Sequence, residues 1–128
     1  MSWKPEGYTS VAPYLISEGA QRVIDFLVEV FDATPLRRFE MPDGSIMHAE
    51  VRVGDTVVMI GDANDQWPAV PAHMHVYVEQ VDVVFNRALA AGGTPVQDPV
   101  ERDGDPDRRG GVKDPAGNTW WIATQVGR

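Results

Sequence analysis

The chain repeats its own pattern about sixty residues apart, and this repeat limits the folds open to it. Ala33-Thr34-Pro35 aligns with Gly93-Thr94-Pro95 at an offset of sixty residues. Later in each half, Gly54-Asp55-Thr56-Val57-Val58 aligns with Gly117-Asn118-Thr119-Trp120-Trp121 at an offset of sixty-three. Self-similarity at a nearly fixed period indicates one supersecondary unit used twice. The alternative is that two short strings match by chance.

Hydrophobic periodicity predicts the elements of the first half. An apolar run at residues 10–16 predicts a strand, and apolar residues at helical spacing from Ala20 to Phe31 predict a helix. Ser17 is the predicted N-cap of this helix, and Thr34-Pro35 is predicted to end it. Alternating or apolar runs predict three further strands, at residues 36–41, 46–53 and 56–60.

The second half is predicted to follow the same order. A strand at residues 73–78 precedes a helical stripe that begins at Val81 and that Gly92-Gly93 ends. Further strands are predicted at residues 94–100 and 117–125. The charged segment 101–111 is predicted to be a loop, and its three arginines could close over a ligand.

These patterns predict an α+β fold of two tandem βαβββ modules, whose strands form a curved mixed sheet with a ligand cup. We expect a single domain spanning residues 1–128. Module 1 takes about residues 8–62, a linker takes about 63–71, and module 2 takes about 72–126.

Strand alternation predicts which side chains face the cup. In the strand 46–53, Met47 and the apolar residues in step with it should meet the helix, which leaves His48 and Glu50 on the open face. In the strand 73–78, the same reasoning leaves His73, His75 and Tyr77 on the open face. A concave face with these groups is a candidate small-ligand site. The alternative is a solvated sheet face whose polar residues have no function.

Composition excludes several classes of function. The chain has no cysteine, so thiolate metal sites and cysteine nucleophiles are excluded. Its formal charge of −8 repels nucleic acid. No apolar stretch approaches the roughly 20 residues that a membrane span needs, and the first residues form no signal core. We expect a cytoplasmic protein with no nucleic-acid or membrane partner.

Four segments resemble the vicinal oxygen chelate superfamily, in particular its PhnB-like branch of glyoxalase, bleomycin-resistance and dioxygenase proteins. They are residues 11–15 (VAPYL), 47–55 (MHAEVRVGD), 75–82 (HVYVEQVD) and 114–124 (DPAGNTWWIAT). The resemblance covers about residues 9–125. It implies paired βαβββ modules, a homodimer and a small organic ligand.

The resemblance also implies four metal-ligand positions, which fall at Ala12 or Pro13, at Val58 or Met59, at His73 and at Trp121. Of these only His73 offers a suitable donor. We therefore expect no cofactor. The alternative is a displaced site for zinc, iron or nickel, built from residues on the cup-facing sides of two strands: His48, Glu50, His73 and His75.

The predicted function is small-molecule binding of the glyoxalase and bleomycin-resistance type. The predicted ligand-binding residues are His48, Glu50, His73, His75, Tyr77 and Trp121, where Trp121 would offer a stacking surface for an aromatic or basic ligand. No catalytic residue is assigned. The alternative function is a metal-dependent lyase, isomerase or dioxygenase that uses the displaced His and Glu set.

Overall fold

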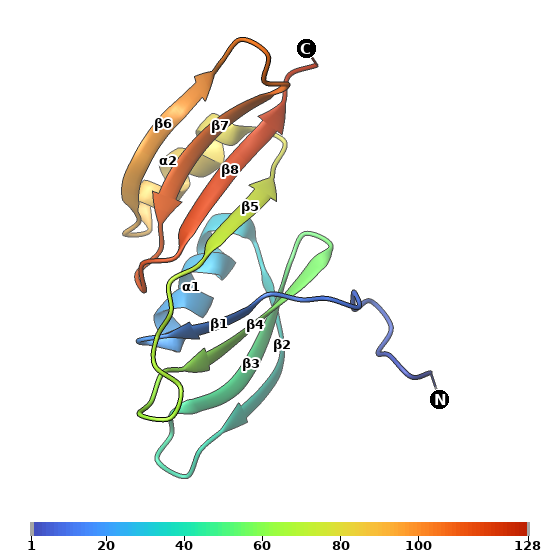
Figure 1. Ribbon diagram of the computed structural model, residues 1–128, viewed down its shortest axis with the longest axis vertical. Coiled ribbons are helices and arrows are strands. Elements are labelled where there is room, and N and C mark those ends of the chain that lie inside the picture. The colour runs from blue at the N-terminus through green and yellow to red at the C-terminus, as the bar shows by residue number, and fades with distance from the viewer. Residues whose placement is uncertain (1, 128) are drawn as a thin grey trace. The chain divides into compact units, whose positions relative to one another are not determined.

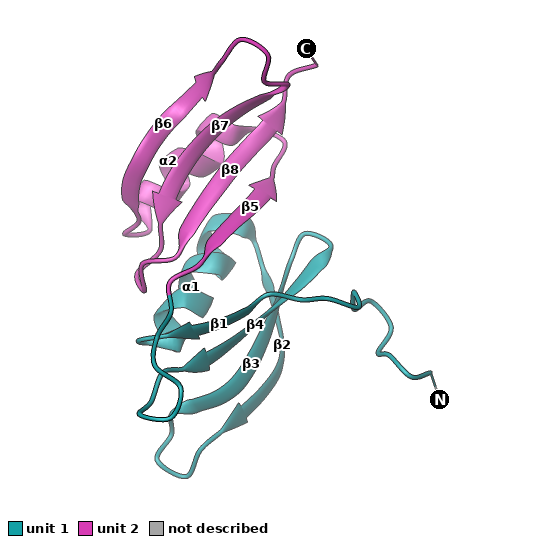
Figure 2. Cartoon of the chain, in the orientation of Figure 1, with its two compact units in different colours: residues 1–70 teal, residues 71–128 magenta. Residues whose placement is uncertain are grey.

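The structure, a computed structural model, describes residues 2–127 and confirms the predicted α+β fold of two tandem βαβββ modules (Figure 1). The chain divides into two compact units, residues 1–70 and 71–128 (Figure 2). The first unit contains β1 (Tyr14–Ser17), α1 (Ala20–Phe31), β2 (Thr34–Glu40), β3 (Ile46–Val53) and β4 (Thr56–Asp62). The second contains β5 (His73–Tyr77), α2 (Val81–Ala90), β6 (Thr94–Glu101), β7 (Asp107–Lys113) and β8 (Thr119–Gln125).

Each unit contains one four-stranded mixed sheet, and the two sheets have the same topology. Their strand orders are β1-β4-β3-β2 and β5-β8-β7-β6. In both, the first strand pairs in parallel with the last, and the other neighbours pair antiparallel. The sixty-residue repeat in the sequence therefore corresponds to a repeat in structure.

The core of each unit lies between its helix and one face of its sheet. In the first unit, Val23, Leu27 and Val30 of α1 are completely buried, as are Val51 of β3 and Ile60 of β4. Full burial of one such side chain stabilises the fold by about 1.5–3 kcal/mol. In the second unit the buried residues of α2 are Val81, Val84, Phe85 and Ala88.

The N-terminus of each helix is held by a side chain from the last strand of its own sheet. The predicted cap, Ser17, is wrong, because its hydroxyl is buried without a hydrogen bond among the described residues. Instead the Ala20 N–H donates to Oδ1 of Asp62 at 2.8 Å. In the second unit the Val81 N–H donates to Oγ1 of Thr124 at 2.9 Å. A sequence search for local caps misses both contacts.

The prediction of a loop at residues 101–111 is wrong for residues 107–111. Asp107–Lys113 forms strand β7, which pairs with both β6 and β8. Arg108 and Arg109 are therefore fixed within a sheet and do not belong to a loop that closes over a ligand. In the described part of the chain, neither helix has the length and apolar composition needed to cross a membrane.

Candidate functional site

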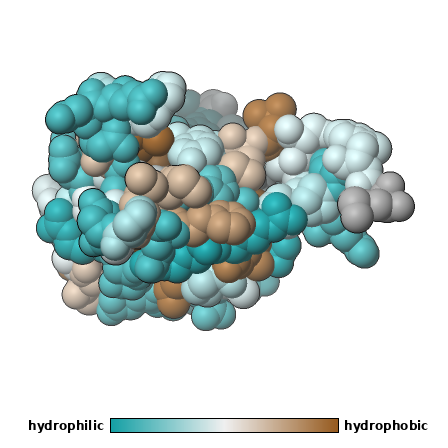
Figure 3. Space-filling view, turned by 90° about the horizontal axis from the view of Figure 1, so that it is seen from below, coloured by the Kyte–Doolittle hydropathy of each residue, from teal (hydrophilic) through white to brown (hydrophobic). Residues whose placement is uncertain are grey.

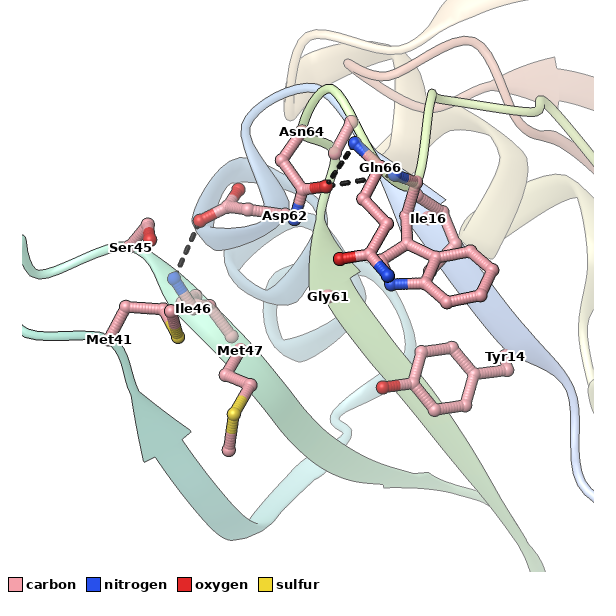
Figure 4. Close-up of a pocket in the computed structure, with 12 residues that line it drawn as sticks. Tyr14, Ile16, Met41, Ser45, Ile46, Met47, Gly61, Asp62, Asn64 and Gln66 are labelled. Atoms are coloured by element: carbon pink, nitrogen blue, oxygen red, sulfur yellow. Dashed lines mark hydrogen bonds between the residues drawn. The ribbon is translucent and has the colours of Figure 1, made fainter.

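A pocket of about 680 Å³ lies in the first unit (Figure 4). Its walls come from β1, from the turn between β2 and β3, from the start of β3, from the end of β4 and from the loop that follows β4. The lining residues are Tyr14, Ile16, Met41, Ser45, Ile46, Met47, Gly61, Asp62, Ala63, Asn64, Gln66 and Trp67. Its size lies within the range of about 300–1,000 Å³ that is typical of small-molecule sites.

An irregularity in strand pairing directs Met47 to the pocket. The register between β2 and β3 shifts between the pairs Phe39–His48 and Glu40–Ile46. A bulge of this kind moves a residue out of the regular alternation. As a result Ile46 takes the buried position, at 3% exposure, while Met47 is 54% exposed. The prediction that Met47 faces the helix is therefore wrong.

Gly61 keeps the centre of this pocket open. A Cβ at this position would lie 2.9 Å from the backbone oxygen of Met47 and 3.7 Å from the ring of Tyr14. In Figure 4, Tyr14 and Met47 lie on either side of Gly61. A side chain at residue 61 would occupy the space between them.

Asn64 holds the loop after β4, and Asp62 joins the end of β4 to the start of β3. Oδ1 of Asn64 accepts the N–H groups of Gln66 at 2.9 Å and of Trp67 at 2.8 Å. Oδ2 of Asp62 accepts the Ile46 N–H at 2.7 Å. The two Asn64 bonds fix the backbone at Trp67, a residue that is 60% exposed. Figure 3, seen from below the view of Figure 1, shows apolar side chains among polar ones.

A chain of hydrogen bonds starts at the pocket wall and runs under it. The hydroxyl of Tyr14 lies 2.9 Å from Nδ1 of His48, and Nε2 of His48 lies 2.8 Å from Oε2 of Glu50. The hydroxyl of Tyr8 donates to Oε1 of Glu50 at 2.6 Å, and the guanidinium of Arg37 lies over the Tyr8 ring. Glu50 is only 3% exposed. The predicted pair His48 and Glu50 is thus in contact, but Glu50 is covered and does not face solvent.

The buried carboxyl of Glu50 makes the stability of the folded protein depend on pH. Burial opposes ionisation of Glu50, but hydrogen bonds from His48 and Tyr8 outweigh it and hold the pKa below its ordinary value. A lowered pKa in the folded state adds stability above the unfolded pKa of about 4.3, and that stability is lost as the pH falls through the folded value. We expect Glu50→Gln to flatten the loss of stability on acidification between about pH 5 and pH 3. Urea unfolding at several pH values measures the slope, and equal slopes in both proteins would contradict this role of Glu50.

The other predicted residues gather on the second sheet. The Trp121 indole donates to Nδ1 of His73 at 3.1 Å, and its ring lies against Gly111, where a Cβ would come within 2.6 Å. Nε of Arg109 donates to Nε2 of His75 at 3.1 Å. Tyr77 packs edge-on against His75 at a centroid distance of 4.8 Å.

Carboxylates tie this second group together. Arg109 donates to Asp105 at 2.6 Å and to Asp107 at 2.8 Å, and the Tyr77 hydroxyl donates to Asp107 at 2.7 Å. Burial and the charge of Arg109 lower the pKa of His75, which keeps its imidazole neutral. The hydrogen bond to Asp107 raises the pKa of Tyr77. These side chains are largely engaged with one another.

None of the six predicted ligand-binding residues lines the 680 Å³ pocket. His48 reaches it only through Tyr14, and Tyr77 lines a separate hollow with Val78, Glu79 and Gln125. The residues missed by sequence reasoning are Tyr14, Met41, Met47 and Gly61. Two features of the sequence could have indicated them. One is the aromatic residue Tyr14 at the start of β1, and the other is Gly61, a residue without a side chain inside strand β4.

The donor set does not fit a divalent metal. Among residues 2–127 no group of three or more His, Asp or Glu side chains could hold such an ion. Of the displaced set, His48 and Glu50 belong to the first unit and bond each other, while His73 and His75 belong to the second and each accept a hydrogen bond from a neighbour. At the position of Val58 or Met59, Val58 pairs with Val51 and is buried.

Comparison with known proteins gives matches over most of the chain. Residues 10–122 match the model of the Glyoxalase/Bleomycin resistance protein/Dioxygenase superfamily. An uncharacterized protein of Mycobacterium tuberculosis is 35% identical, over 91% of this chain and 75% of its own length.

Solved structures share the fold. TioX from Micromonospora sp. ML1 is 26% identical with a TM-score of 0.77, over 92% of this chain and 99% of its own. A PhnB protein from Bacillus cereus is 19% identical with a TM-score of 0.69, over 91% and 99%. TnmS3, an antibiotic binding protein from Streptomyces sp. CB03234, is 17% identical with a TM-score of 0.71, over 98% and 99%.

Proposed function

Because the chain belongs to the Glyoxalase/Bleomycin resistance protein/Dioxygenase superfamily, we propose that it binds a small organic molecule in the pocket of its first unit. The observation that carries this proposal is the pocket itself, with its volume of about 680 Å³ and its mainly apolar walls. The proposed activity is sequestration of the ligand. The description of TnmS3 as an antibiotic binding protein supports this activity, since that protein shares the fold.

The lining favours a flat aromatic ligand. Tyr14 and Trp67 supply two aromatic rings, which prefer to stack on other rings. Met41 and Met47 supply flexible, polarisable thioethers that adapt to different shapes. All four side chains are between 46% and 60% exposed, so their apolar surface is open to a ligand. Covering that surface is the main driving force that we propose for binding.

Charge favours a neutral or cationic ligand over an anion. Residues 1–70 contain five Lys and Arg and eleven Asp and Glu, a formal charge of −6 for this unit. The carboxylate of Asp62 is itself part of the lining. An acidic surface raises the local concentration of cations and repels anions. Basic aromatic compounds, including antibiotics of that chemistry, are therefore the ligands to test first.

Tryptophan fluorescence tests this proposal, because Trp67 is part of the pocket lining. We expect a bound aromatic or basic antibiotic to change the tryptophan fluorescence and to raise the melting temperature, because ligand binding stabilises the folded state. Trp67→Phe should remove most of the fluorescence change and weaken binding several-fold through the smaller ring.

Trp3→Phe is the matched control, since Trp3 is 85% exposed and lies outside the pocket lining. It should leave both signals unchanged. Failure of a broad panel of such compounds to alter fluorescence or melting temperature would contradict the proposed function. A homodimer and a cytoplasmic location stay predictions, and light scattering measures the first of them.

A further inference from the structure

We infer that the Tyr14 hydroxyl accepts a hydrogen bond from the ligand in this pocket, and that the ligand is a flat aromatic molecule carrying an O–H or N–H donor. The inference rests on the proposed function and specifies the chemistry of the same site. It is carried by the direction of the hydrogen bonds that run from Tyr14 through His48 to Glu50.

The direction begins at Glu50. An ionised carboxylate only accepts hydrogen bonds, and the lowered pKa of Glu50 keeps it ionised at neutral pH. Oε1 already accepts the hydroxyl of Tyr8. Oε2 faces Nε2 of His48 at 2.8 Å, so that nitrogen has to carry a proton.

The tautomer of His48 determines which partner donates in the hydrogen bond between His48 and Tyr14. In a neutral imidazole one nitrogen donates and the other accepts. With the proton on Nε2, Nδ1 of a neutral His48 is the acceptor in its 2.9 Å contact with the Tyr14 hydroxyl, so in that tautomer Tyr14 is the donor. What Tyr14 then offers to the pocket is the lone pairs of its oxygen. Tyr14 lines the pocket and is 48% exposed, so its side chain is open to a ligand.

The surroundings hold the imidazole in this orientation. The ring of Tyr14 lies 5.3 Å from the His48 ring and the ring of Phe39 lies 6.1 Å from it, centroid to centroid. Glu50 is only 3% exposed, so water does not compete strongly for its oxygen atoms. The hydrogen bond at one ring nitrogen sets the tautomer of a neutral imidazole, so the buried carboxylate of Glu50 keeps the proton on Nε2.

The first test reads the tautomer of His48 directly. Long-range proton–nitrogen spectra of the ¹⁵N-labelled protein at pH 8 report which ring nitrogen carries the proton. We expect a protonated Nε2 and an unprotonated Nδ1, and Glu50→Gln should weaken this preference. Protonation of both nitrogens, or of Nδ1 alone, would overturn the inference, because Tyr14 would then accept from His48.

The second test compares two probes that share the naphthalene ring and its oxygen substituent. 2-Naphthol has a hydroxyl donor and 2-methoxynaphthalene has none. In titrations followed by amide chemical shifts, we expect wild-type protein to bind 2-naphthol about tenfold more tightly, the effect of one hydrogen bond. In Tyr14→Phe the preference should disappear, while binding of 2-methoxynaphthalene stays as in wild type.

The control is Tyr77→Phe, which removes an exposed tyrosine hydroxyl from the second unit and should keep the tenfold preference. Equal affinity of wild-type protein for both probes would overturn the role of Tyr14 and leave the proposed function standing. If neither probe shifts the amides of the pocket at millimolar concentration, both the inference and the proposed pocket are contradicted.

Discussion

Replacing Gly61 with valine is expected to abolish ligand binding in the first unit while the chain still folds. The new Cβ would meet the backbone oxygen of Met47 at 2.9 Å, so strand β3 or β4 has to shift. Overpacking of this kind costs about 1–3 kcal/mol of stability. The valine methyl groups would also fill the space between Tyr14 and Met47, which the ligand needs. We expect the variant to lose 2-naphthol binding. Its amide resonances should stay well dispersed, which shows that the chain is folded.

Gly111→Val is the matched control for this experiment. Gly111 lies in strand β7 of the second unit, where a Cβ would meet the Trp121 ring at 2.6 Å. This variant should lose stability as well but keep its binding in the first unit. If Gly61→Val does not fold, Gly61→Ala replaces it and should weaken binding. Wild-type affinity in a folded Gly61 variant would contradict the assignment of the pocket.

Replacing Asp114 with alanine is expected to cause a large loss of stability in the second unit. Asp114 is 4% exposed, and its two oxygens accept four hydrogen bonds. The donors are the Ala116 N–H, the backbone and side-chain N–H groups of Asn118 and the Trp120 indole. Alanine leaves several buried donors without a partner, each at a cost of about 1–3 kcal/mol. We expect the free energy of unfolding to fall by about 3 kcal/mol or more.

Urea unfolding followed by tryptophan fluorescence measures this change. Asp114→Asn keeps one oxygen acceptor and should recover part of the loss. The asparagine variant cannot recover all of the lost stability. Its amide nitrogen is a donor, and it would face another donor at the position of the second carboxylate oxygen. A decrease below about 1 kcal/mol in Asp114→Ala would show that the turn before β8 does not depend on this network.

Local pattern was sufficient for most elements. The helix of the first unit follows from the spacing of Val23, Leu27 and Val30, all of them buried. Strand β3 has the bounds expected from its alternation, residues 46–53. The common strand order of the two sheets follows from the repeat, since similar segments pack in similar ways.

Long-range contacts account for the parts that were not predicted. The cap of α1 comes from Asp62, which is 42 residues away from Ala20, so no local motif reveals it. The glycines of β7 suggest a loop, but Gly111 is required because the Trp121 ring occupies the place of its side chain. The bulge that turns Met47 outward depends on pairing with β2, which the sequence of β3 alone does not contain.

Of the candidate site, only the hydrogen-bonded residues beside the pocket were predicted, and the pocket itself was not. Alternation placed His48 and Glu50 on one face of β3, and they do bond each other. Their partners Tyr8 and Tyr14 come from residues that precede α1, and the open surface beside them comes from a turn and a loop. Such contacts depend on the tertiary fold, so the polar residues were identified while the pocket next to them was missed.

A crystal structure of the protein with a bound aromatic ligand tests the central claim most directly. The account predicts the ring of that ligand between Tyr14, Met47 and Trp67, with its donor atom within hydrogen-bond distance of the Tyr14 hydroxyl. A ligand bound instead on the second sheet, beside His73 and Trp121, with the first-unit pocket filled by water, would contradict it.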